Sequence, residues 1–263
     1  MLTKQILYLF DMKRWIPVFI SLLFSVNGFS QNAPMIKRYT VEAQIDSNCA
    51  TAVSLDLFDT AYKKFGLNFL ISDELLKPAY SDIERHRLLF ELYKENGSRV
   101  PLFFSVTSNC SFSKNDIYSF TACTYNACDN SPKSNYEAGM ITVDALTGKV
   151  MKLTDIIDPE KIDSFENYIY TTAVKYHVKN VPTCFISSIN PVMIKGSNNV
   201  TAHTDTIKYF KELTGKFYLS ENNLLVFLKA VHRDYTYTSV EVMTPLFYTR
   251  YFLKPEIAKR LGL

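Results

Sequence analysis

The stretch Ile141–Ile157 reads ITVDALTGKVMKLTDII and sets the expected order of elements in the middle of the chain. Apolar and polar residues alternate up to Thr147-Gly148, which is the pattern of a half-buried strand that ends at a tight turn. A second short apolar run follows, and Thr154-Asp155 then precedes a helical pattern. The stretch therefore predicts a strand, a turn, a strand and the start of a helix, and it contains no catalytic motif. Within it, Asp144 is expected to stabilise the turn by accepting hydrogen bonds from the Thr147-Gly148 amides.

The next helix is the longest that the sequence predicts. It begins at Asp158-Pro159-Glu160, where Asp caps the helix, Pro suits the first position and Glu favours the positive end of the dipole. Apolar residues recur at helical spacing from Ile162 to Tyr176, so one face is expected to be buried. Capping and the helix dipole explain the acidic residues crowded at this start better than calcium binding or paired-carboxylate catalysis.

Elements on the C-terminal side are short, and most of them are strands. Turn residues Ser220–Asn223 separate two apolar runs and indicate a hairpin. In order, the pattern predicts a strand at Thr183–Ile189, a loop at Lys195–His203, a short helix from Thr204 to Gly215, hairpin strands at Lys216–Leu219 and Leu224–Val231, a strand at Ser239–Phe247 and a helix from Pro255.

On the N-terminal side, the sequence predicts a strand, two helices and a hairpin. Val53, Leu57, Ala61 and Phe65 recur at a spacing typical of a helix capped by Ser47 or Asn48, and a second helix contains His86, which we expect to be partly exposed. The full set is a strand at Ile36–Ile45, helices at Ser47–Gly66 and Ser81–Asn96, hairpin strands at Val100–Ser108 and Asp116–Tyr125, a loop at Asn126–Asn135 and a strand at Ala138–Ala145.

The composition is that of a globular protein with enough apolar residues for a core. The chain has 263 residues, of which 47% are hydrophobic and 21% are charged, and its formal net charge is +3. No basic block stands out, so nucleic acid is not an expected partner. The 17 Tyr and 19 Phe favour a fold rich in β-strands.

The N-terminus has the features of a secretory signal peptide spanning residues 1–30. Lys13-Arg14 precede the apolar run Trp15–Val26, and small residues before Gln31 form a cleavage site. The signal is complete from Met12 onward, which makes Met12 the better start codon. The apolar run is too short to span a bilayer, no Cys lies at the cleavage site, and no later segment is long and apolar enough to cross a membrane. We therefore expect a mature periplasmic or secreted protein without a lipid anchor.

Five cysteines follow the signal, and an oxidising compartment favours disulfide bonds. Cys123 and Cys128 are the closest pair in sequence and are the candidates for a local disulfide. Metal binding is the alternative, but neither a CxxC pair nor a His spacing supports it. An odd number of cysteines leaves at least one thiol unpaired or intermolecular.

The sequence contains none of the common catalytic, nucleotide-binding or metal-binding motifs. We therefore predict no catalytic residue, no metal site and no cofactor. A Cys–His pair such as Cys184 with His232 stays open, because such partners meet only in the fold.

The remaining candidate is a recognition surface on the loops after Tyr125 and after Val231. Aromatic and Arg side chains anchor many interfaces and can stack on sugars or on proteins. The alternative is that these tyrosines cover the edge of a sheet. The candidate binding residues are Tyr125, Tyr136, His232, Arg233, Tyr235 and Tyr237.

Four segments, taken in order, resemble the RsiV-like C-terminal domain family, which occurs in lysozyme-sensing anti-sigma factors and beside some peptidoglycan deacetylases. The similar segments are Tyr118–Tyr125, the turn Asp144–Lys149 with Leu153–Ile156, the hairpin Phe217–Phe227, and the ending Thr244–Leu246 with Leu253–Pro255. The resemblance covers roughly residues 100–256. It departs from the family after Tyr125, where Asn126-Ala127-Cys128 replaces glycines and a His, and in Ala230–Tyr237.

The resemblance implies an α+β fold, in which helices pack on an antiparallel sheet and two halves pack intimately together. Residues 31–99 would form an N-terminal α/β half, and residues 100–263 would form the family-like domain. It also implies a non-catalytic binding module of the cell envelope that engages lysozyme-like proteins or peptidoglycan. The chain lacks a sigma-binding segment and a deacetylase domain, so neither activity carries over. A cell-envelope hydrolase with an unrecognised site is the alternative function.

Overall fold

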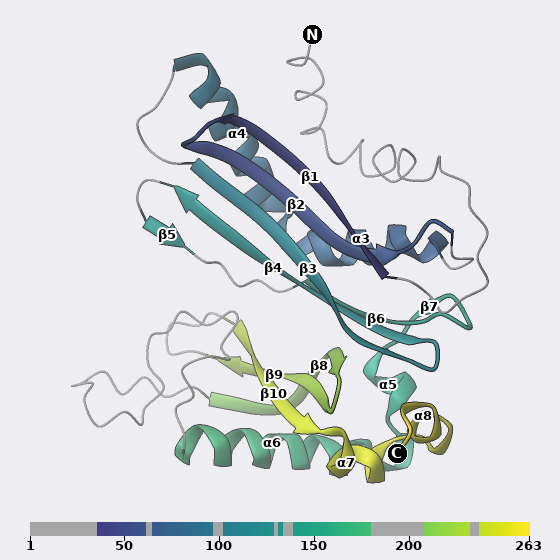
Figure 1. The fold of residues 1–263 in the computed structure, drawn as a ribbon. Helices are drawn as coiled ribbons and strands as arrows, with labels where there is room; N and C mark the ends of the chain where they lie inside the picture. The colour runs from purple at the N-terminus through teal and green to yellow at the C-terminus, as the bar shows by residue number, and fades with distance from the viewer. Residues whose placement is uncertain are drawn as a thin grey trace. The chain divides into compact units, whose positions relative to one another are not determined.

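The computed structural model has two compact units, and several strands begin in one unit and end in the other (Figure 1). One unit contains the described residues up to Cys110 together with Phe120–Ile141 and Ala145–Lys149. The other contains Ser111–Ser119, Thr142–Asp144 and Val150–Leu263. The boundary between the units crosses three strands, which span residues 102–114, 117–128 and 139–144. The structure describes residues 36–61, 65–96, 102–128, 131–133, 139–179, 208–231 and 237–263.

The chain is α+β, as predicted, and its larger sheet is mostly antiparallel. The strand order is β1-β2-β3-β4-β6-β7, and β5 pairs with β4 off this path. The strands are β1 Ile36–Asp46, β2 Cys49–Phe58, β3 Leu102–Lys114, β4 Ile117–Cys128, β5 Ser131–Lys133, β6 Gly139–Asp144 and β7 Lys149–Val150. β2 and β3 pair in parallel, and helical segments connect them.

The helix predicted at Ser47–Gly66 is wrong, because most of this segment is strand β2. The β1–β2 connection is a tight turn, in which the Asn48 amide donates to Asp46 Oδ1 at 2.7 Å. Val53 and Leu57 lie on one face at a spacing of four residues, and this spacing fits a strand as well as a helix. The segment is a strand and not a helix because it pairs with β1 on one side and with β3 on the other.

The crossover from β2 to β3 contains two α-helices joined by a short 3-10 turn. The elements are η1 Phe65–Leu67, α3 Asn68–Leu76, η2 Lys77–Ala79 and α4 Tyr80–Asn96. The helix predicted at Ser81–Asn96 is confirmed as α4. Asn68 fixes α3 to β2, because its side-chain amide donates to the Phe58 carbonyl at 2.8 Å and accepts from the Phe58 amide at 2.9 Å.

His86 is buried in α4 and not partly exposed as predicted. Its exposed fraction is 1%, and neither ring nitrogen has a hydrogen-bond partner among the described residues. Its ring lies 5.2 Å from the Phe104 ring and 6.2 Å from the Phe90 ring, centroid to centroid. Burial among these rings lowers the pKa of His86 to about 4, because the apolar surroundings disfavour the imidazolium.

We expect His86 to make stability fall as the pH drops from about 6.5 to about 4. The unfolded chain takes up a proton near the ordinary histidine pKa, whereas the folded chain does so only near 4. The contribution is complete above pH 6.5 and falls by about 1.4 kcal/mol per pH unit below it. Urea unfolding of the wild type and of His86→Leu across this range measures it. The variant should show a shallower slope, and equal slopes would show that His86 is not buried in the neutral form.

Strands β3 and β4 form the predicted hairpin, although the strands run further than the sequence indicated. The turn is Asn115-Asp116, whose φ angles of 47° and 61° are those of a two-residue type I′ turn. Ser111–Lys114, expected in a loop, belong to β3. Ser111, Ser113 and Lys114 are polar, and the only apolar residue among these four is Phe112, which is buried in the core.

A disulfide between Cys123 and Cys128 does not fit this structure. Both residues lie on the continuous strand β4, and five residues of a strand span about 16 Å. The Cα atoms of a disulfide lie only about 4–7 Å apart.

The stretch Ile141–Ile157 has the predicted strand, turn, strand and helix start. The turn Ala145–Gly148 joins β6 to β7 with Gly148 at φ 71°, and helix α5 spans Leu153–Ile156. The Asp155 carboxylate accepts from the Lys152 amide at 2.7 Å and closes the first turn of α5. The structure adds a partner that the sequence did not reveal, because Arg260 binds both carboxylate oxygens of Asp144.

The second unit is built on a three-stranded antiparallel sheet, in the order β10-β9-β8, and on the long helix α6. These elements are η3 Pro159–Lys161, α6 Ile162–Lys179, β8 Lys208–Ser220, β9 Asn223–Val231 and β10 Tyr237–Pro245. Phe165 and Ile169 of α6 are fully buried with Leu224, Val226 and Leu228 of β9. The Asp158 cap is confirmed, because its carboxylate accepts from the Glu160 amide at 3.1 Å.

The helix predicted at Thr204–Gly215 is wrong over its described part, because residues from Lys208 onward form β8. Pairing of Lys208 with Val231 and of Leu213 with Leu228 extends the hairpin beyond its expected length. The strand predicted at Thr183–Ile189 and the loop at Lys195–His203 lie outside the described residues, as does the signal peptide.

The C-terminal elements follow β10 in close succession. They are α7 Leu246–Thr249, η4 Arg250–Phe252 and α8 Pro255–Leu261. The helix predicted from Pro255 is confirmed as α8, whereas the predicted strand Ser239–Phe247 ends at Pro245 and its last two residues begin α7. No helix within the described residues is long and apolar enough to cross a bilayer.

Candidate binding surface

The structure describes two of the six predicted binding residues. Tyr125 lies on β4 with 43% of its surface exposed, and Tyr237 is the first residue of β10. These two tyrosines belong to different compact units. Tyr136, His232, Arg233 and Tyr235 lie outside the described residues. The predicted role of these loops in binding therefore stays a prediction.

The residues that would build a hydrolase site are likewise not described. Cys184, His203 and His232 lie outside the described residues, and so does the side chain of His177. Among the residues that the structure does describe, no group of three or more His, Cys, Asp or Glu side chains could hold a metal ion.

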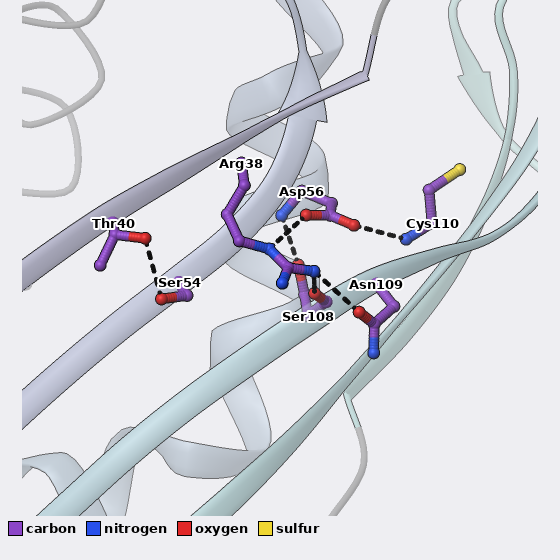
Figure 2. A network of polar contacts seen from close by, with 7 residues as sticks. All are labelled: Arg38, Thr40, Ser54, Asp56, Ser108, Asn109 and Cys110. Carbon is purple, nitrogen blue, oxygen red and sulfur yellow. Dashed lines mark hydrogen bonds and ion pairs between the residues drawn. The ribbon is translucent and has the colours of Figure 1, made fainter.

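A network of polar side chains joins β1, β2 and β3 in the first unit (Figure 2). Arg38 Nε donates to Asp56 Oδ1 at 2.8 Å. Its Nη2 donates to the Ser108 carbonyl at 3.2 Å and to Asn109 Oδ1 at 2.9 Å. Figure 2 shows that the guanidinium reaches from β1 past Asp56 to β3.

The hydrogen bonds of this network connect β2 to β3 beyond the point where their parallel backbone pairing ends. The register between β2 and β3 ends at Ser54 and Thr107. Beyond that point the Asp56 amide donates to Ser108 Oγ at 2.7 Å, and the Cys110 amide donates to Asp56 Oδ2 at 3.1 Å. Both carboxylate oxygens are therefore used inside the sheet, and we assign the network a structural role.

Three exposed aromatic side chains gather in the second unit, immediately after β10. The exposed fractions are 72% for Phe247, 63% for Tyr248 and 68% for Tyr251. Residues three and four positions apart share a face of a helix, and α7 runs directly into η4, so these rings share one side. The largest contiguous apolar patch on a typical monomer covers a few hundred Å², and such patches often mark interaction sites.

Tyr251 is held in place although its ring is exposed. Lys161 Nζ lies 4.5 Å from the centroid of the ring and donates to the Tyr251 carbonyl oxygen at 2.8 Å. The Phe252 ring meets it nearly edge-on, at 5.3 Å and 81°. A cation over the ring and a neighbouring aromatic edge both favour one ring orientation.

The inner side of the same segment anchors it to the core of the unit. Leu246 and Thr249 are buried, and Thr249 Oγ1 donates to the Leu246 carbonyl at 2.9 Å. The Phe252 ring lies 5.4 Å from Phe165 and 5.3 Å from Tyr168, both on α6. The exposed rings therefore stand on a fixed element and not on a free loop.

Phe247, Tyr248 and Tyr251, with the cations Lys161 and Arg250, are called the α7–η4 surface below. Sequence reasoning missed this surface because it extended the last strand through Phe247. The available signal was the run Phe247–Phe252, FYTRYF, which follows Pro245-Leu246 and places four aromatic residues around one Arg. Leu246 and Thr249 are buried, and the two residues between them are exposed. This is the spacing of a helix, whereas a strand would bury every second residue.

The fold is similar to that of solved proteins of the DUF3298 family. A member from Bacteroides fragilis NCTC 9343 aligns with 88% of this chain and 99% of its own, at a TM-score of 0.52 and 11% sequence identity. A DUF3298 family protein from Pseudomonas aeruginosa PAO1 aligns with 86% of this chain and 97% of its own, at a TM-score of 0.44 and 12% identity. No protein-family model and no curated protein matches the sequence. The likeness to the Bacteroides protein supports the α+β fold and carries no information about activity.

Proposed function

We propose that this protein is a non-catalytic binding module of the cell envelope, periplasmic or secreted after cleavage of its signal peptide. Its partner is peptidoglycan or a lysozyme-like protein, and the α7–η4 surface makes the contact. This surface carries the proposal. Three mostly exposed aromatic rings on an anchored element are typical of a binding site, and they add little to the hydrophobic core because most of their surface stays in water.

The order of motifs supports the choice of partner. The turn after Asp144 and the hairpin Phe217–Phe227 resemble the RsiV-like C-terminal domain, and the DUF3298 family is related to that domain. Thr244–Leu246, one of the resembling segments, leads directly into Phe247 of the α7–η4 surface. The proposed contact therefore lies beside a segment on which the resemblance rests.

We expect the triple variant Phe247→Ala/Tyr248→Ala/Tyr251→Ala to lose at least tenfold in affinity for its partner. Exposed aromatic anchors each contribute on the order of 1–2 kcal/mol to such contacts, and tenfold corresponds to about 1.4 kcal/mol. Co-sedimentation with insoluble peptidoglycan and capture on immobilised hen lysozyme measure the two candidate partners in parallel.

The matched control is Leu88→Ala/Leu92→Ala on α4, which removes two side chains that are 53% and 54% exposed and that belong to the other compact unit. It should bind like the wild type. Thermal unfolding should separate the triple variant from the wild type by no more than a few degrees, because the removed rings are exposed. A wild-type protein that binds neither peptidoglycan nor lysozyme would refute the proposed function.

A further inference from the structure

The area of the α7–η4 surface decides between the two classes of partner. Three aromatic side chains that are about two-thirds exposed offer roughly 400 Å². A stable protein–protein interface takes about 800 Å² from each partner. The exposed rings alone are therefore half of what a protein partner needs, whereas they match a ligand that contacts a few side chains.

The rings have the form that a sugar chain requires. The hydrophobic face of a pyranose ring stacks on a flat aromatic ring, and its hydroxyl groups stay in water. The segment Leu246–Phe252 is about 10 Å long at 1.5 Å per residue. Tyr251 stands in its second turn, while Phe247 and Tyr248, whose rings meet edge-on at 5.7 Å, stand in its first. Successive rings at this spacing suit successive sugar units of one chain.

The charges of the surface favour an anionic ligand. The Lys161 ammonium is partly neutralised, because Asp158 Oδ2 lies 3.6 Å from it. Arg250 is exposed, and among the described residues no acidic side chain pairs with it. Arg250 precedes Tyr251 in the chain, and a guanidinium can bind a carboxylate through two parallel hydrogen bonds.

We propose that the α7–η4 surface binds a carboxylate-bearing glycan chain, with sugar rings stacked on Tyr251 and on the Phe247–Tyr248 pair and with the carboxylate on Arg250. This inference rests on the proposed function and names the glycan, rather than a lysozyme-like protein, as the ligand. Lys161 acts as a positioning residue, because it holds the Tyr251 ring from one side.

The test is a calorimetric titration of the full purified chain with three defined probes. The anionic probe is a soluble tetrasaccharide of alternating N-acetylglucosamine and N-acetylmuramic acid. The neutral probe is the tetrasaccharide of N-acetylglucosamine, and the protein probe is hen lysozyme. The variants are Tyr251→Ala, Arg250→Gln and the matched exposed aromatic Phe69→Ala on α3, whose side chain is 44% exposed.

We expect the anionic tetrasaccharide to bind about fivefold more tightly than the neutral one, as an exposed ion pair contributes up to about 1 kcal/mol. Arg250→Gln should abolish that difference and leave binding of the neutral probe unchanged. Tyr251→Ala should weaken both by about tenfold, and Phe69→Ala should weaken neither.

Three results would overturn the inference, and they differ in what they leave of the proposed function. Binding to lysozyme without binding to either glycan would leave the proposed function standing and refute the glycan. Glycan binding that is unchanged in Tyr251→Ala would place the ligand elsewhere. Failure of all three probes, together with failure to sediment with peptidoglycan, would refute the proposed function itself.

Discussion

Gly139→Ala is expected to lower the free energy of unfolding by about 3 kcal/mol or more, the upper range for overpacking a well-packed site. Gly139 begins β6 where this strand crosses the end of α3, and a Cβ built on it would fall on the Leu75 carbonyl oxygen. The Leu75 carbonyl carbon and Cα would lie only 2.7 Å from that Cβ. These are backbone atoms of a buried residue, so no side-chain rotation can relieve the overlap.

Gly66→Ala is the matched control, because a Cβ at Gly66 would meet nothing within 4 Å. It should leave stability unchanged or raise it slightly, since Ala reduces the freedom of the unfolded chain. Chemical denaturation monitored by far-UV circular dichroism measures both variants. If Gly139→Ala is as stable as Gly66→Ala, then β6 does not approach α3 as closely as described.

Arg260→Met is expected to cost about 3 kcal/mol, the lower range for removing one partner of a buried ion pair. Nη1 and Nη2 of Arg260 each donate to one oxygen of Asp144 at 2.9 Å, and only 8% of Asp144 is exposed. Without the guanidinium, the Asp144 carboxylate would be left buried next to an apolar side chain. The same change removes the bond from Nη2 to the Asn115 carbonyl at 3.2 Å, which ties α8 to the β3–β4 turn.

Arg87→Met provides the comparison for Arg260→Met. Arg87 pairs with Glu84 one turn away on α4, where the acid is 59% exposed. Exposed pairs of this kind contribute only a few tenths of a kcal/mol. Unfolding free energies at neutral pH should therefore separate the two variants by 2 kcal/mol or more, and equal losses would show that the Asp144 pair is hydrated. In the double variant Asp144→Asn/Arg260→Met, part of the lost stability should return, because the buried carboxylate that lost the guanidinium is replaced by a neutral amide.

The elements with explicit local signals could be predicted from the sequence. Thr147-Gly148 supplied a turn with a positive φ, and Asp158 with Pro159 supplied a helix start that is independent of tertiary context. The hairpin turn at Ser220–Asn223 belongs to the same group. In each case a few neighbouring residues carry the information.

Elements whose structure depends on residues far away in the sequence could not be predicted from local patterns. Cys49–Phe58 has apolar residues at positions compatible with either period, and its pairing with β1 and β3 makes it a strand. Burial of His86 depends on Phe104, which β3 brings to α4. Arg260 and Asp144 are far apart in sequence, so their pairing could not be inferred from local patterns.

The candidate site shows the same limit. The sequence pointed to aromatic and charged residues in loops, and only Tyr125 and Tyr237 of that set are described. The sequence analysis did not predict the α7–η4 surface, because it extended the last strand through Phe247. Which side of this segment is exposed depends on the contacts of its buried side, where the Phe252 ring packs against Phe165.

The most direct test of the α7–η4 surface is hydrogen–deuterium exchange of the full chain with and without soluble peptidoglycan fragments. A bound glycan should slow exchange at the backbone amides of Met243–Lys254, while amides around Tyr125 on β4 exchange as before. Slower exchange at Tyr125 or at residues 232–237, with Met243–Lys254 unchanged, would contradict the account and place binding on the loops that the sequence alone suggested.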